Sequence, residues 1–392
     1  MTQVRPLILR EGQRIHVDHI DKTAAHALKR MGVVSMTTGV GGQRVLQAGS
    51  KVGVVAIDDL QVVILPKVDI GRLVFMMSYA RRPNFWRDDL VHVDPQDDFI
   101  ELLARAFIDA SRRALAQGVL KGYVAIDAAL PLMRGRIREG DQLRRHFGRS
   151  IPLEVRFDEY SVDIAENQLL VLAAERLLKV PGLPCWARGP LQRLRLQLSE
   201  VSPPPLEAEL PVWSPSRLNV RYQPALAVAE LILAGQSFEQ QVGEARINGF
   251  LLDMARIFED SITVALQESF QRFGGVSRAQ FQAHLDDERA IPMRPDFVWE
   301  ERGVPRVVVD AKYKAEQPSG FPNADYYQLL AYATVLGLSE GHLIYAKGNE
   351  EAREHHVRLA GTRLVAHAVD LQAEPQVLLQ SIEDLVGSLR PL

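Results

Sequence analysis

Residues 294–314 read RPDFVWEERGVPRVVVDAKYK, and this segment restricts the possible folds more than any other part of the chain. Two runs of β-forming residues, 296–299 and 306–312, flank a polar turn that has Gly303 near its middle. The apolar run 307–309 is typical of a strand that is buried on both faces. We therefore expect an antiparallel hairpin whose second strand lies inside a sheet.

This hairpin would bring charged side chains to one place. Asp296 and Asp310 lie roughly opposite each other if the strands pair antiparallel about the turn. Side chains two positions apart share a face, so Lys312 projects beside Asp310. Two carboxylates this close repel unless a cation separates them, and Mg²⁺ is a hard cation that binds carboxylate oxygens. A lysine beside metal-bound water can orient or deprotonate it, or stabilise charge on a phosphate.

The order of these residues carries a resemblance. Pro295-Asp296 before one strand and Asp310-Ala311-Lys312 on the next resemble the motif of the PD-(D/E)XK nuclease superfamily. An ordinary hairpin with a solvated charged face is the alternative, but the charged triplet directly follows an apolar run and needs partners wherever it is buried. The resemblance implies that Asp296 and Asp310 hold the metal, that Lys312 positions or activates the attacking water, and that the Ala311 carbonyl adds a ligand.

A helix is expected downstream, over residues 325–332. Gln328 and Tyr332 lie four positions apart and therefore share one helical face. The pair resembles the Gln-x-x-x-Tyr element of RecB-like members of the superfamily. That resemblance implies that both side chains support the site or contact the DNA backbone.

A third carboxylate is expected from upstream. Residues 249–266 read as one amphipathic helix, in which apolar residues recur at helical spacing: Phe250, Met254, Ile257, Phe258, Ile262 and Leu266. Glu259 stands at the edge of this apolar stripe, and spacing alone also allows a surface glutamate. The superfamily often supplies an acidic residue from the preceding helix, so the resemblance implies Glu259 as the third metal ligand, with Asp260 in reserve.

Composition sets outer limits on the function. The chain has 392 residues and 47% hydrophobic residues, which is enough for two or three domains. A net charge of −3 is unusual for a protein that grips DNA unaided, because phosphate binding depends mainly on lysine and arginine. The single cysteine, Cys185, excludes an internal disulfide and is expected to be a small packed residue in a reducing cytoplasm. With no signal peptide and no long apolar run, we expect a cytoplasmic protein without a membrane partner.

Four segments are expected along the chain. Residues 1–95 are rich in strand and turn patterns, residues 96–201 are mainly helical with a basic stretch, residues 202–223 are a proline-rich linker, and residues 224–392 form the nuclease domain. The expected fold class is α/β (α+β overall). A strand-rich and helical N-terminal region precedes a PD-(D/E)XK, restriction-endonuclease-like domain with a mixed central sheet flanked by helices.

Local patterns refine this division. We expect paired strands at 51–57 and 61–65, a turn at 39–42, and helices at 96–117, 165–178 and 224–235. The sequence Gly-x-x-x-x-Gly-Lys-Ser/Thr does not occur, so we expect no nucleotide to bind to this chain itself. The histidine pairs His16/His19 and His355/His356 have no cysteine or second spaced pair nearby and are expected to be ordinary surface residues.

A cluster of arginines lies in the second segment. Its members are Arg134, Arg136, Arg138, Arg144 and Arg145. Such a cluster is a candidate surface for DNA or for a protein partner. A solvated basic face is the alternative.

Several separated segments resemble one family, the McrC subunit of McrBC-type, modification-dependent restriction systems. They are 62–67 (VVILPK), 76–80 (MMSYA), 134–137 (RGRI), 160–167 (YSVDIAEN), 217–222 (RLNVRY) and 249–260, followed in order by the nuclease motifs. The resemblance implies an N-terminal region that docks on a hexameric McrB-like AAA+ GTPase and stimulates it. It also implies Mg²⁺-dependent cleavage of double-stranded DNA that contains modified cytosine, with Mn²⁺ able to substitute.

Two other functions remain open. One is an autonomous RecB-like DNA nuclease in repair or defence, which would cut without a nucleoside triphosphate. The other is a non-catalytic adaptor that activates an AAA+ partner. The complete Asp-Asp-Lys set argues against the adaptor, and cleavage by the isolated chain would support the autonomous nuclease.

Overall fold

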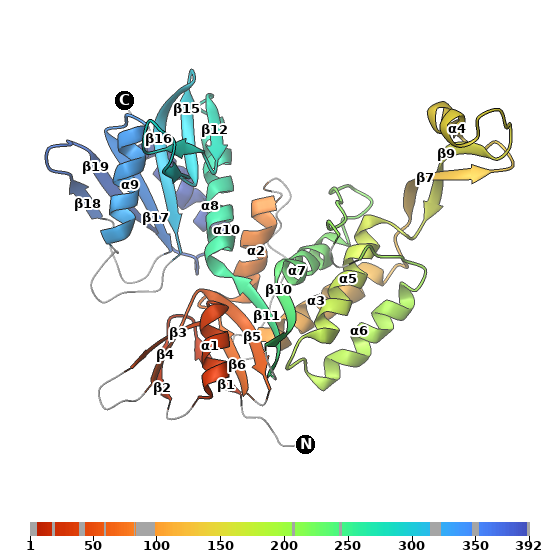
Figure 1. The fold of residues 1–392 in the computed structure, drawn as a ribbon, viewed down its shortest axis with the longest axis horizontal. Helices are drawn as coiled ribbons and strands as arrows, with labels where there is room; N and C mark the ends of the chain where they lie inside the picture. Colours follow the sequence, from red (N-terminus) through yellow and green to blue (C-terminus); the bar gives the residue numbers. More distant parts are fainter. Residues whose placement is uncertain are drawn as a thin grey trace. The chain divides into compact units, whose positions relative to one another are not determined.

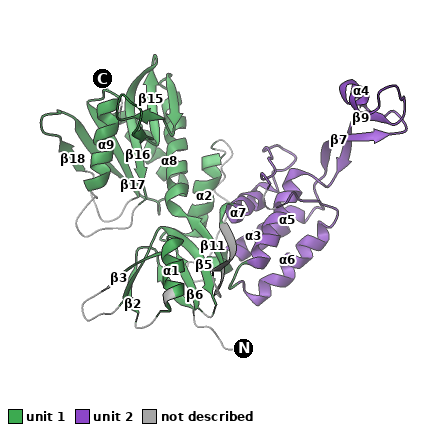
Figure 2. Ribbon diagram, in the orientation of Figure 1, with its two compact units in different colours: residues 1–102, 180–182, 234–392 green, residues 103–179, 183–233 purple. Residues whose placement is uncertain are grey.

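The computed structural model describes residues 6–17, 20–38, 44–58, 60–81, 83, 99–205, 208–242, 245–313, 323–346 and 353–389. The chain divides into two compact units (Figure 2). The first unit contains residues 1–102, 180–182 and 234–392, and the second contains residues 103–179 and 183–233. The N-terminal segment and the segment with the nuclease motifs thus belong to one unit, whereas the proline-rich segment 202–223 belongs to the other. The expected turn at 39–42 lies outside the described residues.

The N-terminal part of the first unit is built on two sheets (Figure 1). Its elements are β1 (Leu7–Arg10), β2 (Arg14–Val17), α1 (Lys22–Arg30), β3 (Val34–Thr38), β4 (Arg44–Ala48), β5 (Lys51–Ile57), β6 (Leu60–Leu65) and α2 (Ile70–Arg81). A three-stranded sheet has the order β2-β4-β3, and a five-stranded sheet has the order β1-β6-β5-β11-β10. The expected pairing of β5 with β6 is confirmed.

Two strands of the five-stranded sheet come from much later in the chain. They are β10 (Gln236–Val242) and β11 (Ala245–Asp253), and β11 pairs antiparallel with β5. The expected helix over 249–266 is therefore wrong at its start, because α8 (Met254–Gln271) begins only after β11 ends. The Asp253 side chain caps α8 by accepting hydrogen bonds from the backbone N–H groups of Ala255 and Arg256. Phe250, which fits the helical spacing, is buried in the strand instead.

The C-terminal part of the first unit is built on a six-stranded sheet. Its elements are β12 (Val276–Ala279), β13 (Ala283–His284), β14 (Pro292–Met293), β15 (Phe297–Glu301), β16 (Val304–Lys312), α9 (Asn323–Val335), β17 (Glu340–Ala346), β18 (Arg353–His356), β19 (Arg363–Val369) and α10 (Pro375–Leu389). The strand order is β12-β15-β16-β17-β19-β18. The pairs β16–β17 and β17–β19 are parallel and the others are antiparallel, so the sheet is mixed as expected.

Helices cover both faces of this sheet. On one face, Leu329 and Tyr332 of α9 pack with Val298 and Val308 in a buried cluster. Neighbouring residues of a strand point to opposite faces. Accordingly, Phe297 lies against Phe270 of α8, with ring centroids 5.3 Å apart. α10 packs against α8 and β19.

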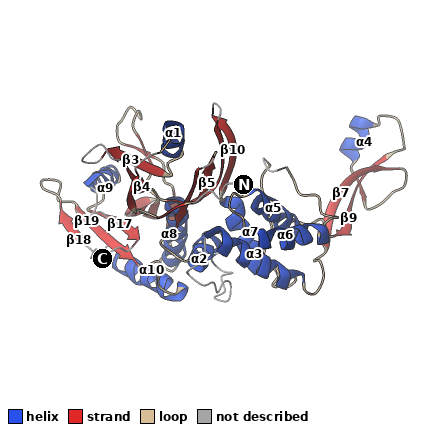
Figure 3. Ribbon diagram, turned by 90° about the horizontal axis from the view of Figure 1, so that it is seen from below, coloured by secondary structure: helices blue, strands red, loops and turns tan. Residues whose placement is uncertain are grey.

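The second unit combines helices with a long strand pair (Figures 1 and 3). Its elements are most of α3 (Phe99–Leu115), β7 (Gly122–Leu130), β8 (Arg136–Ile137), α4 (Glu139–Arg145), β9 (Leu153–Ser161), α5 (Ala165–Lys179), α6 (Cys185–Gln197) and α7 (Gln223–Ala234). The expected helices in this part are confirmed as α3, α5 and α7. The antiparallel pair of β7 and β9 extends away from the helices and carries α4 near its far end, and the sequence patterns did not predict it.

Polar residues in two of the McrC-like segments stabilise loops of the second unit. Asn167, which is fully buried, donates hydrogen bonds to the backbone oxygens of Leu120 and Val162 at 2.8 and 2.7 Å. The Tyr222 hydroxyl accepts a hydrogen bond from the Leu120 N–H at 2.8 Å. These two residues therefore have a structural role. In the described part of the chain, no helix has the length and apolar character needed to cross a membrane.

Candidate functional site

The acidic hairpin forms as the sequence predicts. β15 and β16 pair antiparallel, and the register that places Phe297 opposite Val309 brings Asp296 opposite Asp310 one step further on. The two-residue turn consists of Arg302 and Gly303, whose φ angles of 53° and 79° are both in the left-handed region. Turns with two such residues match the twist of paired strands, and glycine adopts this conformation at little cost.

Asp296 is held by two hydrogen bonds. Its Oδ2 accepts from the Ala311 backbone N–H at 2.9 Å, and its Oδ1 accepts from Gln280 Nε2 at 2.8 Å. Asp296 is buried. Each carboxylate oxygen therefore has a fixed donor, and the orientation of Asp296 is coupled to the backbone between Asp310 and Lys312.

Asp310 and Lys312 form a close ion pair at the end of β16. Lys312 Nζ lies 2.6 Å from Asp310 Oδ2, and Asp310 is only 1% exposed. The pKa of Asp310 is raised to about 7, because burial and the nearby Asp296 raise it by more than Lys312 lowers it. For Lys312, burial favours a lower pKa, but Asp310, Asp296 and Glu259 outweigh burial, and the pKa is raised.

Glu259 on α8 belongs to the same electrostatic cluster. Burial raises its pKa to about 7, Asp296 contributes in the same direction, and Lys312 opposes them. Asp260 is more exposed and lies 3.8 Å from Arg256 on its own helix. The structure thus brings Asp296, Asp310 and Lys312 together. Glu259 is near enough to interact electrostatically with Asp296 and Lys312, and the more exposed Asp260 also interacts with Asp296.

The donor set fits a hard divalent cation. Asp310 Oδ2 is buried and accepts no well-aligned hydrogen bond from a described residue, and the Lys312 ammonium group lies 2.6 Å from it. Within the described ranges, no three His, Cys, Asp or Glu side chains are arranged around a common ion position. Mg²⁺ usually binds to one or two carboxylates and keeps several waters. Asp296 and Asp310, with Glu259 nearby, supply that number of oxygens.

The helical pair downstream lies beside this cluster. Gln328 Nε2 donates a hydrogen bond to the Tyr332 hydroxyl at 2.6 Å, and Tyr332 is buried whereas Gln328 is exposed. Burial raises the pKa of Tyr332, and Asp310 contributes to the rise. The expectation that the two side chains share one face of a helix is confirmed.

Two contacts of the site were not predicted. Gln280, which holds Asp296, follows β12 and has a φ of 48°. Tyr313, directly after Lys312, donates a hydrogen bond to Glu11 in the N-terminal part of the same unit. Neither residue belongs to a short motif, and each partner lies far away in the sequence. A positive φ at a non-glycine residue is the one local sign of a special role for Gln280.

The arginine cluster lies in the second unit, and most of its charge is neutralised. Arg138 forms ion pairs with Asp127, Asp141 and Glu154. Arg144 lies 2.8 Å from Asp141, Arg145 lies 3.6 Å from Glu154, and the Arg134 guanidinium stacks on Phe157. Arg136 has no ion pair with a described residue. The same region exposes large apolar side chains, namely Leu132, Met133, Leu143, Phe147 and Ile151.

The cysteine and the described histidines of the two pairs lie outside the acidic site. Cys185 is exposed at the start of α6, so the expectation of a packed cysteine is wrong. His355 and His356 are exposed on β18, as expected. His16 lies on β2, and His19 lies outside the described residues.

The mixed six-stranded sheet has helices on both faces and contains the acidic hairpin as its second and third strands, which makes the C-terminal part of the first unit a mixed α/β fold. The sequence model of the McrBC 5-methylcytosine restriction system component family matches residues 46–346, and the chain belongs to this family. No curated protein matches the sequence.

Two solved structures are similar to the chain. The first is a chain of the refined half-complex from a tetradecameric assembly of Thermococcus gammatolerans McrB AAA+ hexamers with bound McrC. It has 17% identity and a TM-score of 0.56 over 97% of this chain and 100% of that chain. The second is from the cryo-EM structure of the T. gammatolerans McrBC complex. It has 18% identity and a TM-score of 0.40, and the match covers 68% of this chain and 88% of that chain. The first likeness supports the fold.

Proposed function

We propose that this chain is the DNA-cleaving subunit of a modification-dependent restriction system and hydrolyses phosphodiester bonds in double-stranded DNA with Mg²⁺. The single observation that carries this proposal is the convergence of Asp296, Asp310 and Lys312 at one end of the hairpin. Two carboxylates and an ammonium group at this spacing are suited to a divalent cation and a phosphate. Membership of the McrBC family supports the substrate class.

Each residue of the site has a distinct part in the proposed reaction. Asp296 and Asp310 would hold Mg²⁺, and Glu259 and the Ala311 carbonyl would be further ligands. The bound ion supplies Lewis-acid activation of the phosphate and a more acidic water. Lys312, whose pKa is raised and which therefore stays protonated, orients the attacking water and places a positive charge near the oxygens that become more negative. Gln280 keeps Asp296 in place, and Gln328 with Tyr332 supports the site or contacts the DNA backbone.

We also propose that the chain acts with a McrB-like AAA+ GTPase. A net charge of −3 and the paired arginines leave few free cations for an unaided grip on DNA. The solved assembly with the higher TM-score contains McrB AAA+ hexamers with bound McrC. The exposed apolar side chains near α4 are the most suitable partner surface, because clustered apolar side chains on a soluble protein usually mark an interaction site.

Cleavage of methylated and unmethylated plasmid tests the nuclease. The reaction is run with Mg²⁺, with and without a McrB-like partner and GTP, for wild type, Lys312→Ala and Asp310→Asn. Asp310→Asn is nearly isosteric and removes a buried charge, so we expect no cleavage with an unchanged or higher melting temperature. Cleavage that survives in both variants would refute the assigned site.

The same experiment separates the alternatives. Cleavage that requires the partner and GTP supports a restriction subunit, and preference for methylated plasmid supports modification dependence. Cleavage by the isolated chain indicates an autonomous nuclease. Stimulated GTP hydrolysis without any cleavage indicates an adaptor. Phe147→Ala, at an exposed position near α4, should lower partner stimulation without changing the melting temperature.

A further inference from the structure

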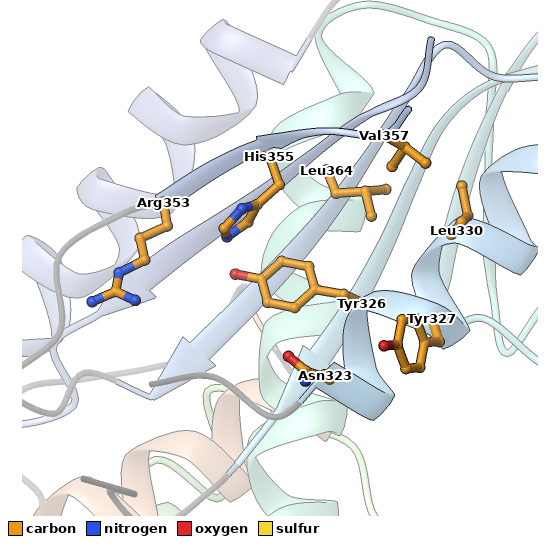
Figure 4. Close-up of a pocket in the computed structure, with 8 residues that line it drawn as sticks. All are labelled: Asn323, Tyr326, Tyr327, Leu330, Arg353, His355, Val357 and Leu364. Carbon is orange, nitrogen blue, oxygen red and sulfur yellow. The ribbon is translucent and has the colours of Figure 1, made fainter. Parts of the chain in front are cut away.

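A pocket of about 330 Å³ lies between α9 and the edge of the six-stranded sheet, and its lining contains no residue of the acidic hairpin among those described (Figure 4). Its lining residues are Asn323, Tyr326, Tyr327, Leu330, Arg353, His355, Val357 and Leu364. The volume is at the lower end of the roughly 300–1,000 Å³ typical of small-ligand sites. None of the described residues that line it is acidic.

The regular spacing of the lining residues explains how the pocket forms. Asn323, Tyr326, Tyr327 and Leu330 follow the i, i+3, i+4, i+7 pattern of one helical stripe. On the sheet side, Arg353, His355 and Val357 alternate, so these residues share the face of β18 and its continuation that looks toward α9. Two rigid elements therefore shape the pocket.

The chemistry of the lining is aromatic with a positive rim. Tyr326 and His355 are in edge-to-face contact, with ring centroids 4.8 Å apart and an interplanar angle of 80°. Tyr327 is 69% exposed, which leaves much of its side chain accessible at the edge of the pocket. Leu330, Val357 and Leu364 make an apolar wall (Figure 4).

Arg353 supplies the positive charge. Its guanidinium makes no ion pair with any residue in the described part of the chain, and it lies at one end of the pocket (Figure 4). This distinguishes it from Arg363 on the adjacent strand, which is paired with Glu340 at 2.6 Å and Glu354 at 3.3 Å. Among the described residues, Arg353 thus has no acidic partner that would compete with an anion on a ligand.

The pocket is next to the acidic hairpin along the same helix. Tyr327 directly precedes Gln328, which donates its hydrogen bond to Tyr332. Tyr332 is close enough to Asp310 for the two groups to interact electrostatically. One stripe of α9 thus faces the hairpin, and the neighbouring stripe lines the pocket. Across the sheet, Asp310 pairs with Leu343, Leu343 with Ala366 and Ala366 with Arg353. Arg353 therefore lies level with Asp310, three strands and roughly 14 Å away, and a DNA strand bound at the hairpin can extend to the pocket.

We propose that this pocket receives one unstacked nucleobase of the DNA strand beside the cleaved bond. This inference rests on the proposed nuclease function and adds a binding subsite to it. The base stacks on Tyr327 against the apolar wall, and Arg353 binds the adjoining phosphate. Aromatic stacking accepts any base because every base has a π-face, and an arginine that has no ion pair with a described residue suits an anionic ligand.

Binding of DNA in the absence of cleavage tests the subsite. The full chain is titrated in EDTA onto oligonucleotides that carry 2-aminopurine as an unpaired base, and affinity and fluorescence quenching are measured. Tyr327→Ala should weaken binding roughly tenfold and lose the quenching, whereas Tyr327→Phe should retain both. Arg353→Ala should lower the slope of log affinity against log salt by about 1.

His356→Ala is the matched control, because His356 lies on the same strand but on the opposite face and its side chain is 75% exposed. This variant should bind DNA as wild type does. Tyr327→Ala and Arg353→Ala proteins with wild-type affinity and quenching would overturn the subsite. A Tyr327→Ala protein that binds DNA normally but no longer stimulates the GTPase of the partner would also overturn the nucleobase subsite. That result would indicate that the pocket binds a peptide segment of the partner.

The test is independent of cleavage, so the two proposals can fail separately. If wild type cleaves DNA while the pocket variants bind normally, only the subsite is refuted. If wild type stacks the base but cleaves nothing with Mg²⁺, partner and GTP, the subsite is retained as a DNA contact and the nuclease function is refuted.

Discussion

Tyr313 donates a hydrogen bond from its hydroxyl to Glu11 Oε2 at 2.8 Å, although 302 positions separate the two residues in the chain. The Tyr313 ring also lies against Phe258, with centroids 5.7 Å apart. Tyr313 directly follows Lys312, and Phe258 directly precedes Glu259. A residue of the N-terminal part therefore fixes a side chain that contacts both elements of the acidic site, so the two parts of the first unit depend on each other.

The Glu11–Tyr313 contact predicts a pH dependence of stability. Burial raises the pKa of Glu11 from 4.5 to about 7, against the opposing effects of the Tyr313 hydrogen bond and Lys67. A carboxyl group whose pKa is higher in the folded than in the unfolded chain stabilises the fold most at pH values below its unfolded pKa, here 4.5. This contribution is lost as the pH rises through the folded pKa of about 7. Glu11→Gln keeps a neutral polar side chain, so it should be more stable than wild type at pH 8, by about 3 kcal/mol.

The stability difference between Glu11→Gln and wild type should shrink as the pH falls toward 4.5. Chemical denaturation at several pH values measures it, and taking the difference removes the contributions of Glu259 and Asp310, whose pKa values are raised in the same direction. Glu288→Gln, at an exposed position of the same unit, is the control and should show no pH-dependent difference. A constant difference for Glu11→Gln would contradict the assigned buried carboxyl.

Gln280 is predicted to position Asp296. Its side chain donates to Asp296 Oδ1 at 2.8 Å from a backbone with a φ of 48°. Gln280→Asn tolerates this backbone, because asparagine adopts the left-handed region more readily than most residues, but its amide is one methylene too short to reach. Loss of a group that orients a metal ligand typically costs 10- to 100-fold in metal affinity or activity, so cleavage should need roughly that much more Mg²⁺.

A Mg²⁺ titration of the cleavage rate checks the role of Gln280. Gln282→Ala, at an exposed position two residues away, should retain the wild-type Mg²⁺ dependence. A Gln280→Asn enzyme with an unchanged Mg²⁺ requirement would show that Asp296 needs no support from this side chain. An unchanged melting temperature would separate positioning from folding.

A buried histidine pair predicts loss of stability in acid. His342 Nδ1 and His367 Nε2 lie 3.3 Å apart in the six-stranded sheet. Burial lowers the pKa of His342 to about 3, with His367 and Arg363 adding to the effect, and burial lowers the pKa of His367 to about 4. Glu340 lies 3.9 Å from His342 and is the nearest acidic group.

Stability from these histidines is fully present above their unfolded pKa of about 6.5 and is lost as the pH falls through the folded values. At pH 5, each of the two histidines should lower the free energy of unfolding by about 2 kcal/mol relative to its value at neutral pH. His342→Asn keeps a polar atom near the Nδ1 position and cannot titrate, so its stability should fall less than that of wild type between pH 7 and pH 5. The free energy of unfolding of both proteins is measured by chemical denaturation at pH 7 and pH 5. An equal fall in the two proteins would contradict the burial of a neutral His342.

The acidic hairpin and the Gln328–Tyr332 pair could be predicted from the sequence because local pattern specifies both. Alternation, a turn glycine and a four-residue spacing are properties of neighbouring residues. The start of α8 could not be predicted from spacing, because Phe250 satisfies both a helical stripe and a buried strand. Only the pairing of β11 with β5, about 200 positions earlier, decides between them.

Contacts between distant segments account for most of what the sequence did not predict. Glu11 and Gln280 belong to no motif, and their roles depend on tertiary packing. The strands β7 and β9 alternate in exposure along their length, but their many alanines and charged residues resemble neither a typical strand nor a helix. The resemblance to the McrC family identified the chain correctly because it used the order of several segments.

The pairing of β11 with β5 depends on a glycine at position 53. Gly53 has a φ of 133°, and a Cβ placed there would lie 2.1 Å from the Phe250 backbone oxygen. Gly53→Ala must therefore strain β5 or separate it from β11, and we expect a loss of roughly 2–4 kcal/mol in the free energy of unfolding. Because β11 leads directly into α8, which carries Glu259, cleavage should fall with stability.

Gly387→Ala is the matched control for this substitution. Gly387 is an exposed residue of α10 with open space around its Cβ position, so alanine there should be neutral or stabilising by about 0.5–1 kcal/mol. Thermal melts and DNA cleavage are measured for both variants. A Gly53→Ala protein as stable as wild type would show that β5 and β11 do not approach as closely as the structure requires, and the path from the N-terminal sheet to Glu259 would lose its support.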